Sequence, residues 1–161
     1  MIKHDQTHTL IACLTALLLF AAVAHRTSAS PRGQDDGKPQ VSTMAGVFTT
    51  AQASRGEETY MTICVGCHPA GTYTGKTFTV SWGNRPLSDL FSIIKNTMPK
   101  VDPGMLSPEE TSQVIAYILK SNGVPAGKTE LPSELAPLKN IRIEMPGMAA
   151  PKIERENRSI R

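Results

Sequence analysis

Residues 64–68 read Cys-Val-Gly-Cys-His, which places two thiols and an imidazole within five positions of a 161-residue chain. The chain has only three cysteines and four histidines in all. A random chain of this composition would contain C-x-x-C-H about once in a thousand cases, so coincidence is a poor explanation. Three uses of such a cluster have to be compared: a metal site, a redox pair of thiols, or anchorage of a larger group.

The N-terminal sequence predicts export and decides between these uses. Residues 10–24 form an uncharged apolar run that follows a thin basic region containing Lys3. Fifteen residues fall short of the roughly 20 needed to span a bilayer as a retained anchor. Small residues then offer cleavage sites near Ala24 and Ala29. We therefore predict a signal peptide over residues 1–29, and a periplasmic mature protein that no longer contacts the membrane.

Removing residues 1–29 removes one cysteine and three histidines, so the remaining ones are Cys64, Cys67 and His68. A structural zinc site needs four ligands, so a carboxylate would have to complete it. A thioredoxin-like pair would lie beside a βαβ pattern, and no strand precedes this segment. Covalent haem attachment accounts for all three residues: each thiol adds to a vinyl group, and His68 ligates the iron. The motif thus predicts one covalent haem c, with zinc and redox sites as the alternatives.

The composition agrees with a chain that wraps around a large apolar guest. Hydrophobic residues make up 40% of the chain but aromatic residues only 5%, so few large side chains are available for a core. The net charge is only +3, and no cluster of Lys and Arg interleaves with aromatic residues. This pattern argues against nucleic acid as a partner.

Composition also divides the chain into segments. Residues 30–52 are rich in Pro, Gly, Ser, Thr and charge without a sustained period, which predicts a flexible leader. Residues 53–124 form the candidate domain, and residues 125–161 a Pro-rich extended tail. We expect the tail to lie over the domain through four apolar contacts, Leu131, Leu135, Leu138 and Ile141.

Three helices and no strand of any length are predicted, so the fold class is a small all-α domain. The first helix is expected to begin at Ser54, with Glu57 completing a capping box, and to run into residues 64–68. The second follows Pro86 and has apolar residues at helical spacing: Leu87, Leu90, Phe91 and Ile94. The third has Ser107 as N-cap, Pro108 at its first position, Glu110 in the capping box and Asn122-Gly123 at its end. Its expected apolar face consists of Val114, Ile115, Ile118 and Leu119.

A six-coordinate iron needs a second axial ligand, and methionines are the remaining candidates. Met98 follows the second helix directly, and Pro99 ends that helix and stiffens the turn. Met105 precedes Ser107, where a hydrophobic staple is the simpler interpretation. We therefore predict Met98 as the ligand, against the alternative that either methionine only fills a gap in the core. A thioether opposite an imidazole favours ferrous iron and suits electron transfer.

Taken together, residues 54–123 resemble a class I c-type cytochrome domain. The resemblance rests on a first helix carrying C-x-x-C-H, a middle helix, the Met98-Pro99 turn and a last helix with the core VIAYIL. Residues 97–132, TMPKVDPGMLSPEETSQVIAYILKSNGVPAGKTELP, are also similar to monohaem cytochromes that are electron acceptors or subunits of periplasmic dehydrogenases. The resemblance implies a contact between a small residue of the first helix, Gly56, and an aromatic residue of the last, Tyr117, with Tyr60 alongside. Pro69, which follows His68, departs from the Gly or Ala that the family often has there.

The resemblance implies a one-electron carrier with no substrate chemistry of its own. Its partners would be redox proteins: a dehydrogenase as donor, and a terminal oxidase or another cytochrome as acceptor. Trp82 and Arg85 are candidates for binding the haem propionates, against the alternative that Trp82 only packs and Arg85 is solvated. Three lysines are candidates for the docking face: Lys76, Lys95 and Lys100. The alternative function is a haem enzyme or ligand sensor with an open distal site.

Overall fold

The computed structural model describes residues 41–148. The predicted signal peptide, the first part of the predicted leader (30–40) and the last part of the tail (149–161) lie outside the described residues. Within residues 41–148, no helix is long and apolar enough to cross a membrane.

The first long helix, α2 (Thr50–Thr59), continues directly into a π-helical turn, η3 (Tyr60–Cys64), which leads into residues 64–68. The predicted start at Ser54 is wrong: the N-cap is Thr49, whose side chain accepts a hydrogen bond from the Gln52 N–H at 3.1 Å. Ser54 lies inside the helix on an exposed face. A threonine hydroxyl caps a helix much as serine does, and the burial of Gln52 beneath it adds a reason for the earlier start.

The second and third predicted helices are confirmed as α4 (Leu87–Thr97) and α5 (Pro108–Ser121). The capping box of α5 is complete, because Ser107 Oγ accepts from the Glu110 N–H at 3.1 Å and Glu110 Oε2 accepts from the Ser107 N–H at 2.8 Å. Asn122 is the C-cap, and Gly123 follows with a positive φ of 77°. Local capping chemistry therefore sets both ends of this helix.

Within residues 41–148, two α-helices and two strands were not predicted. They are α3 (Gly75–Trp82), the four-residue α6 (Leu135–Leu138), and the strands β1 (Val41–Ser42) and β2 (Ile141–Arg142). Helix α3 has one buried residue, Phe78, and no repeating apolar face, so periodicity could not reveal it. The two-residue strands are too short to leave a pattern. The all-α class with three main helices is confirmed.

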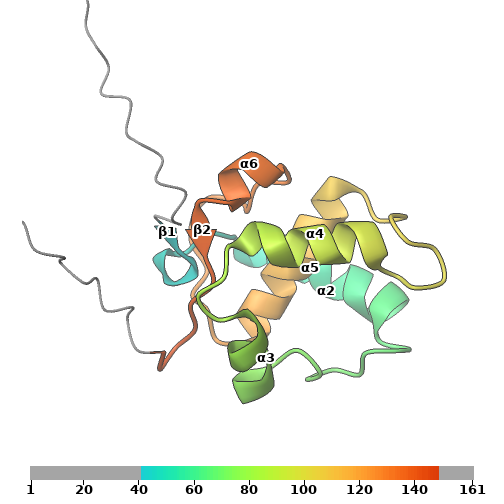
Figure 1. The fold of residues 1–161 in the computed structure, drawn as a ribbon, viewed down its shortest axis with the longest axis horizontal. Helices are drawn as coiled ribbons and strands as arrows, with labels where there is room; N and C mark the ends of the chain where they lie inside the picture. Colours follow the sequence, from blue (N-terminus) through green and yellow to red (C-terminus); the bar gives the residue numbers. More distant parts are fainter. Residues whose placement is uncertain (1–40, 149–161) are drawn as a thin grey trace, which may run out of the picture. The chain divides into compact units, whose positions relative to one another are not determined.

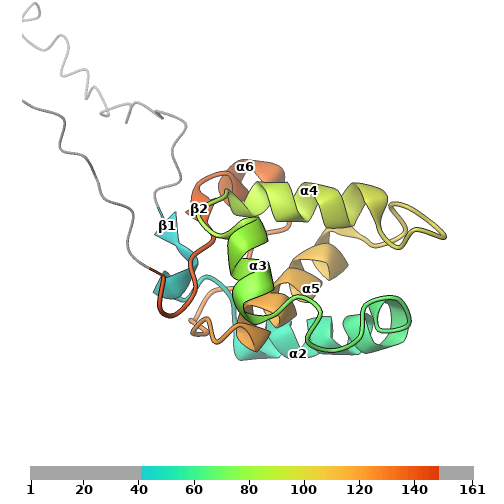
Figure 2. The same cartoon turned by 60° about the horizontal axis from the view of Figure 1, so that its bottom comes forward.

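Helix α5 lies between the other two main helices. It packs most extensively against α2 and also contacts α4, and Figure 2 shows α4 and α2 on opposite sides of it. Gly56 of α2 lies so close to α5 that a Cβ there would come within 1.8 Å of the Gln113 carbonyl oxygen. One turn further along, Tyr60 packs on Tyr117 with ring centroids 5.1 Å apart. The expected small-residue contact is thus with the α5 backbone, and the aromatic contact is made by Tyr60.

The tail covers the helices, and the end of the expected leader pairs with it. Three of the four expected contact residues are buried (Leu131, Leu138 and Ile141), whereas Leu135 is exposed. Strands β1 and β2 pair in parallel with Val41 opposite Ile141. Figure 1 shows the two strands side by side. In the described part of the expected leader, Thr43 and Phe48 are fully buried, so residues 41–52 are packed rather than free. Their few apolar positions have no period, which is why composition alone indicated flexibility.

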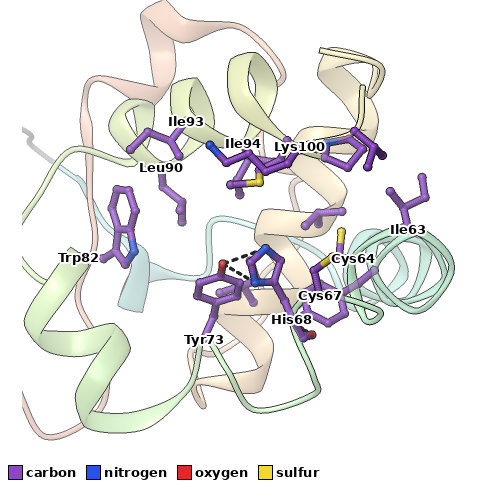
Figure 3. A pocket seen from close by; sticks show the side chains of 16 residues that line it. Ile63, Cys64, Cys67, His68, Tyr73, Trp82, Leu90, Ile93, Ile94 and Lys100 are labelled. Carbon is purple, nitrogen blue, oxygen red and sulfur yellow. Dashed lines mark hydrogen bonds between the residues drawn. The ribbon is translucent and has the colours of Figure 1, made fainter. Parts of the chain in front are cut away.

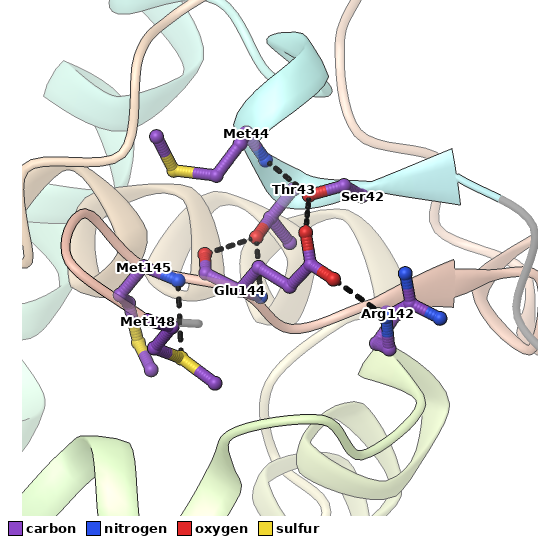
Figure 4. A network of polar contacts seen from close by, with 7 residues as sticks. All are labelled: Ser42, Thr43, Met44, Arg142, Glu144, Met145 and Met148. Carbon is purple, nitrogen blue, oxygen red and sulfur yellow. Dashed lines mark hydrogen bonds and ion pairs between the residues drawn. The ribbon is translucent and has the colours of Figure 1, made fainter. Parts of the chain in front are cut away.

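Side-chain hydrogen bonds join residues 42–43, at the start of the described chain, to Glu144, just after β2 (Figure 4). Glu144 accepts from the Ser42 hydroxyl and, at 2.7 Å, from the Arg142 Nε–H. Thr43 Oγ1 accepts from the Glu144 N–H at 2.8 Å. We call residues 41–43 and 141–145 the clasp. The hydrogen bond from Ser42, assisted by Arg142, holds the pKa of Glu144 below its ordinary value although burial opposes the shift.

Candidate functional site

A cavity of about 870 Å³, counting the space at its mouth, lies between the η3 segment, α4 and α5. Figure 3 shows Cys64, Cys67, His68 and Tyr73 on one side of it, and Leu90, Ile93, Ile94 and Lys100 on the other. The remaining lining residues are Tyr60, Ile63, Trp82, Met98, Pro99, Val101, Val114 and Ile118. Its walls are mainly apolar, as is usual for small-molecule sites.

The predicted anchor residues all line this cavity. The chain turns sharply after η3, because the N–H groups of Cys67 and His68 both donate to the Cys64 carbonyl, at 3.2 and 2.9 Å. The Tyr60 hydroxyl donates to the His68 carbonyl at 2.7 Å and closes the turn. Both thiols are free, and burial raises the pKa of Cys64. The turn therefore presents two thiols and one imidazole to the same space.

Met98 also lines the cavity, and the competing Met105 does not. Met98 is the C-cap of α4, where its N–H donates to the Ile94 carbonyl at 3.1 Å. Met105 is 51% exposed. Of the methionines in residues 41–148, Met98 is the one in the cavity lining. The structure thus brings together the two parts of the predicted ligand set, which lie thirty residues apart in the sequence.

These residues fit a haem. The donor set combines two thiols, which can form thioethers, with an imidazole and a thioether, the two ligand types that cytochromes c use on iron. Two apolar side chains at the cavity are exposed, Ile93 at 42% and Val101 at 93%. A large apolar group in the cavity would cover surface of this kind, and its burial would be favourable.

Comparison with known families agrees with this geometry. Residues 51–118 match the family model described as cytochrome C oxidase, cbb3-type, subunit III. The match supports the interpretation of these residues as a class I c-type cytochrome domain. Comparison with curated proteins and with solved structures gave no significant match. The match supports haem-based electron transfer, and with it an electron carrier rather than an enzyme.

The two predicted propionate-binding residues occupy different positions in the cytochrome domain. Trp82, at the end of α3, lines the cavity. Arg85 does not; its guanidinium lies over the Trp82 ring, 4.7 Å from the centroid, and pairs with Asp89 at 2.9 Å. The Arg85 guanidinium is therefore already paired with the Asp89 carboxylate, and it also stacks on the Trp82 ring. Binding of propionates by Trp82 and Arg85 stays a prediction.

The three candidate docking lysines also differ in position. Lys100 is exposed and lines the cavity. Lys95 donates to the Gly104 carbonyl at 2.9 Å and so holds the loop that follows Met98. Lys76 is exposed on α3, outside the cavity lining.

Sequence reasoning missed one polar residue of the site, Tyr73. Its hydroxyl lies 3.0 Å from Nδ1 of His68 and 3.4 Å from Nε2. Tyr73 lies in an irregular loop between η3 and α3, so no period or motif marked it. Sequence reasoning also missed a second role of the apolar helix faces. Four residues that were expected as core also line the cavity: Leu90, Ile94, Val114 and Ile118.

The zinc alternative can be compared with the same structure. In the part of the chain that the structure describes, no group of three or more His, Cys, Asp or Glu side chains is arranged to hold a metal ion.

Proposed function

We propose that the domain carries single electrons on one haem c, attached through Cys64 and Cys67 and ligated by His68 and Met98. The observation that supports this most directly is the presence of Met98 in the same cavity as the C-x-x-C-H segment. When bound, the haem supplies a one-electron Fe(III)/Fe(II) couple. The two thiols would each form a thioether with a vinyl group, which makes attachment permanent.

The protein side chains would tune and protect this couple. A thioether ligand at Met98 raises the reduction potential relative to a second histidine and suits both oxidation states. Leu90, Ile94 and Ile118 line the cavity with hydrocarbon and would keep water from the iron. Main-chain hydrogen bonds at both ligand positions, described above for His68 and Met98, limit their movement between oxidation states. Such pre-set geometry keeps the reorganisation on electron transfer small.

We also propose the setting in which the carrier works. The predicted signal peptide supports export, with cleavage near Ala24 or Ala29 and a periplasmic product. The resemblance of residues 97–132 to cytochrome partners of dehydrogenases supports a dehydrogenase as donor, and a terminal oxidase or another cytochrome as acceptor. Residues 53–124 would form the carrier domain, and the tail from residue 125 would be available to hold it against a partner subunit. The chain would act either as a free carrier or as a subunit of such a complex.

The ligand assignment is tested by replacing Met98. We expect the full chain, produced in a host that attaches haem c, to give a c-type pyridine haemochrome spectrum with one haem per chain. Met98→Ala should then lower the reduction potential strongly, because the thioether is lost. Met105→Ala is the matched control and should behave like the wild type, since Met105 lies outside the cavity lining.

Two results would contradict the proposal at different levels. An unchanged potential and absorption spectrum in Met98→Ala would favour the haem enzyme or ligand sensor with an open distal site. A wild-type chain without a c-type spectrum, matured in a competent host, would exclude both haem functions.

A further inference from the structure

The loop that begins at Met98 projects from the helices. It spans residues 98–106, from the C-cap of α4 to the buried side chain of Leu106. Figure 1 and Figure 2 both show it extending beyond the end of α4. Residues 100–103 are all exposed, and Val101 is 93% exposed. Burial therefore fixes this loop at Leu106 but not in its middle.

Hydrogen bonds within the loop close it on itself. The Gly104 N–H donates to the Met98 carbonyl at 3.4 Å, across the base of the loop. The N–H groups of Asp102 and Met105 donate to the carbonyls of Pro99 and Asp102. Gly104 has a positive φ of 87°, which glycine adopts without strain. These bonds give the loop its shape, but they do not attach it to the helices.

A single side chain attaches the returning half of the loop to α4. The Lys95 ammonium donates to the Gly104 carbonyl at 2.9 Å. Within residues 41–148, this is the one hydrogen bond that joins residues 99–105 to an element outside the loop. Lys95 lies in the last turn of α4, where the unpaired carbonyl groups of a helix favour a positive charge. It is also only three residues before Met98, so it holds the loop next to the predicted ligand.

We propose that Lys95 is a positioning residue for the distal ligand: its hydrogen bond to Gly104 holds the loop closed and so keeps the Met98 thioether in the cavity. The proposal rests on the function proposed above, in which Met98 ligates the iron. Opening of the loop would withdraw the Met98 side chain and leave the distal position to another ligand. Lys95 acts through the loop, because its own side chain is not part of the cavity lining.

Added imidazole measures how often the loop opens. It binds the ferric holoprotein only in molecules from which Met98 has withdrawn, so its apparent affinity is proportional to the open fraction. Lys95→Met removes the ammonium and keeps a long unbranched side chain. We expect Lys95→Met to bind imidazole about tenfold more tightly than the wild type, the factor that corresponds to the loss of a hydrogen bond from a charged group. Titration followed by absorption spectroscopy gives both affinities.

Lys128→Met is the matched control. Lys128 is an exposed lysine of the tail, outside the loop and outside the cavity lining. Its replacement removes the same positive charge and leaves the loop intact. We expect its imidazole affinity to equal that of the wild type. A gain of the same size in both variants would show an effect of net charge and would overturn the proposal.

Amide hydrogen exchange separates opening of this loop from a general loss of stability. In the Lys95→Met holoprotein, the Gly104 and Met105 amides should exchange about tenfold faster than in the wild type, because their hydrogen bonds lie inside the loop. The Gly75 amide is held by Asn122 Oδ1 in a different loop, so it should keep its rate. Equal acceleration at Gly75 and Gly104 would show general destabilisation and would overturn the proposal.

A measurement on the wild type tests the hydrogen bond even if Lys95→Met fails to fold. In NMR of the isotope-labelled, reduced holoprotein, the Lys95 ammonium protons should exchange with water more slowly than those of the exposed Lys128. Equally fast exchange of the two ammonium groups would overturn the proposal.

Imidazole binding also separates the failure of this proposal from the failure of the proposed function. A wild type that binds imidazole as tightly as Met98→Ala would contradict ligation by Met98, and with it the role of Lys95. A wild type that binds imidazole more weakly than Met98→Ala, but with the same affinity as Lys95→Met, would overturn the role of Lys95 alone.

Discussion

Gly56 is the residue at which α2 and α5 come closest. The position that a Cβ would occupy is 1.8 Å from the Gln113 carbonyl oxygen and 2.8 Å from the Val114 nitrogen. Both neighbouring atoms belong to the backbone of α5, so the rotation of a side chain cannot relieve the clash. Val114 also lines the cavity, so the contact between α2 and α5 borders the candidate site.

Gly56→Ala should therefore destabilise the domain, although alanine is the better helix former. In an unhindered helix this change stabilises by roughly 0.5–1 kcal/mol. Here the added methyl group must push the helices apart, and overpacking of this kind costs about 1–3 kcal/mol. Chemical denaturation followed by circular dichroism measures the difference. Ser54→Ala, on the exposed face of the same helix, is the control and should have little effect; a Gly56→Ala variant as stable as the wild type would show that the helices are not in close contact.

Helix ends differ in how strongly the local sequence specifies them. The start of α5 is specified by a complete local motif, in which Ser107 and Glu110 satisfy each other's backbone N–H groups. For the start of α2 we predicted Ser54 as the cap, and the structure uses Thr49. Tertiary packing favours the earlier cap, because Gln52 exchanges two hydrogen bonds with the main chain of Leu131, at 2.9 and 2.8 Å.

Ser107→Ala is the prediction at the scale of the element. It removes the acceptor of the Glu110 N–H and should lower the free energy of unfolding by about 1 kcal/mol. Ser121→Ala, at the other end of the same helix, is the matched control and should be nearly neutral. The two variants are compared by urea denaturation. Equal stabilities would mean that the capping box contributes nothing to α5.

At the scale of the whole described unit, the clasp joins residues more than ninety positions apart. Glu144 is its centre: it binds Ser42 and Arg142 through its carboxylate and Thr43 through its main chain. The pKa of Glu144 is held below its ordinary value, first by the Ser42 hydrogen bond. The folded protein therefore releases this proton more readily than the unfolded chain does. Acidification into the range where an ordinary glutamate, near pH 4.3, takes up its proton should weaken the clasp.

Glu144→Gln tests this pH dependence. At neutral pH the variant should be less stable than the wild type, because the charge-assisted hydrogen bonds are lost. The difference should shrink as the pH falls through the lowered pKa of Glu144, where the wild-type side chain also becomes neutral. Thermal unfolding at a series of pH values gives the two curves. Glu58→Gln, an exposed glutamate on α2, should show no such convergence with the wild type; parallel curves for Glu144→Gln would contradict the role of the clasp.

The sequence by itself determined the all-α class, the ends of α5 and the C-x-x-C-H segment, because these depend on short-range chemistry between neighbouring residues. It also singled out Met98, because Pro99 ends the helix that carries it. The sequence could not determine which residues surround the site. Tyr73 was missed because its loop is held to the end of α5 by Asn122, and that contact leaves no period in the sequence.

Only the tertiary structure decided that the apolar faces of α4 and α5 wall a cavity, since the same spacing is expected of a solid core. It likewise decided that residues 41–52 are packed, because Thr43 and Gln52 bond to Glu144 and Leu131, which lie 101 and 79 positions further along the chain. Local signals specify where helices begin and end, whereas the composition of a site depends on contacts between segments that are distant in the chain.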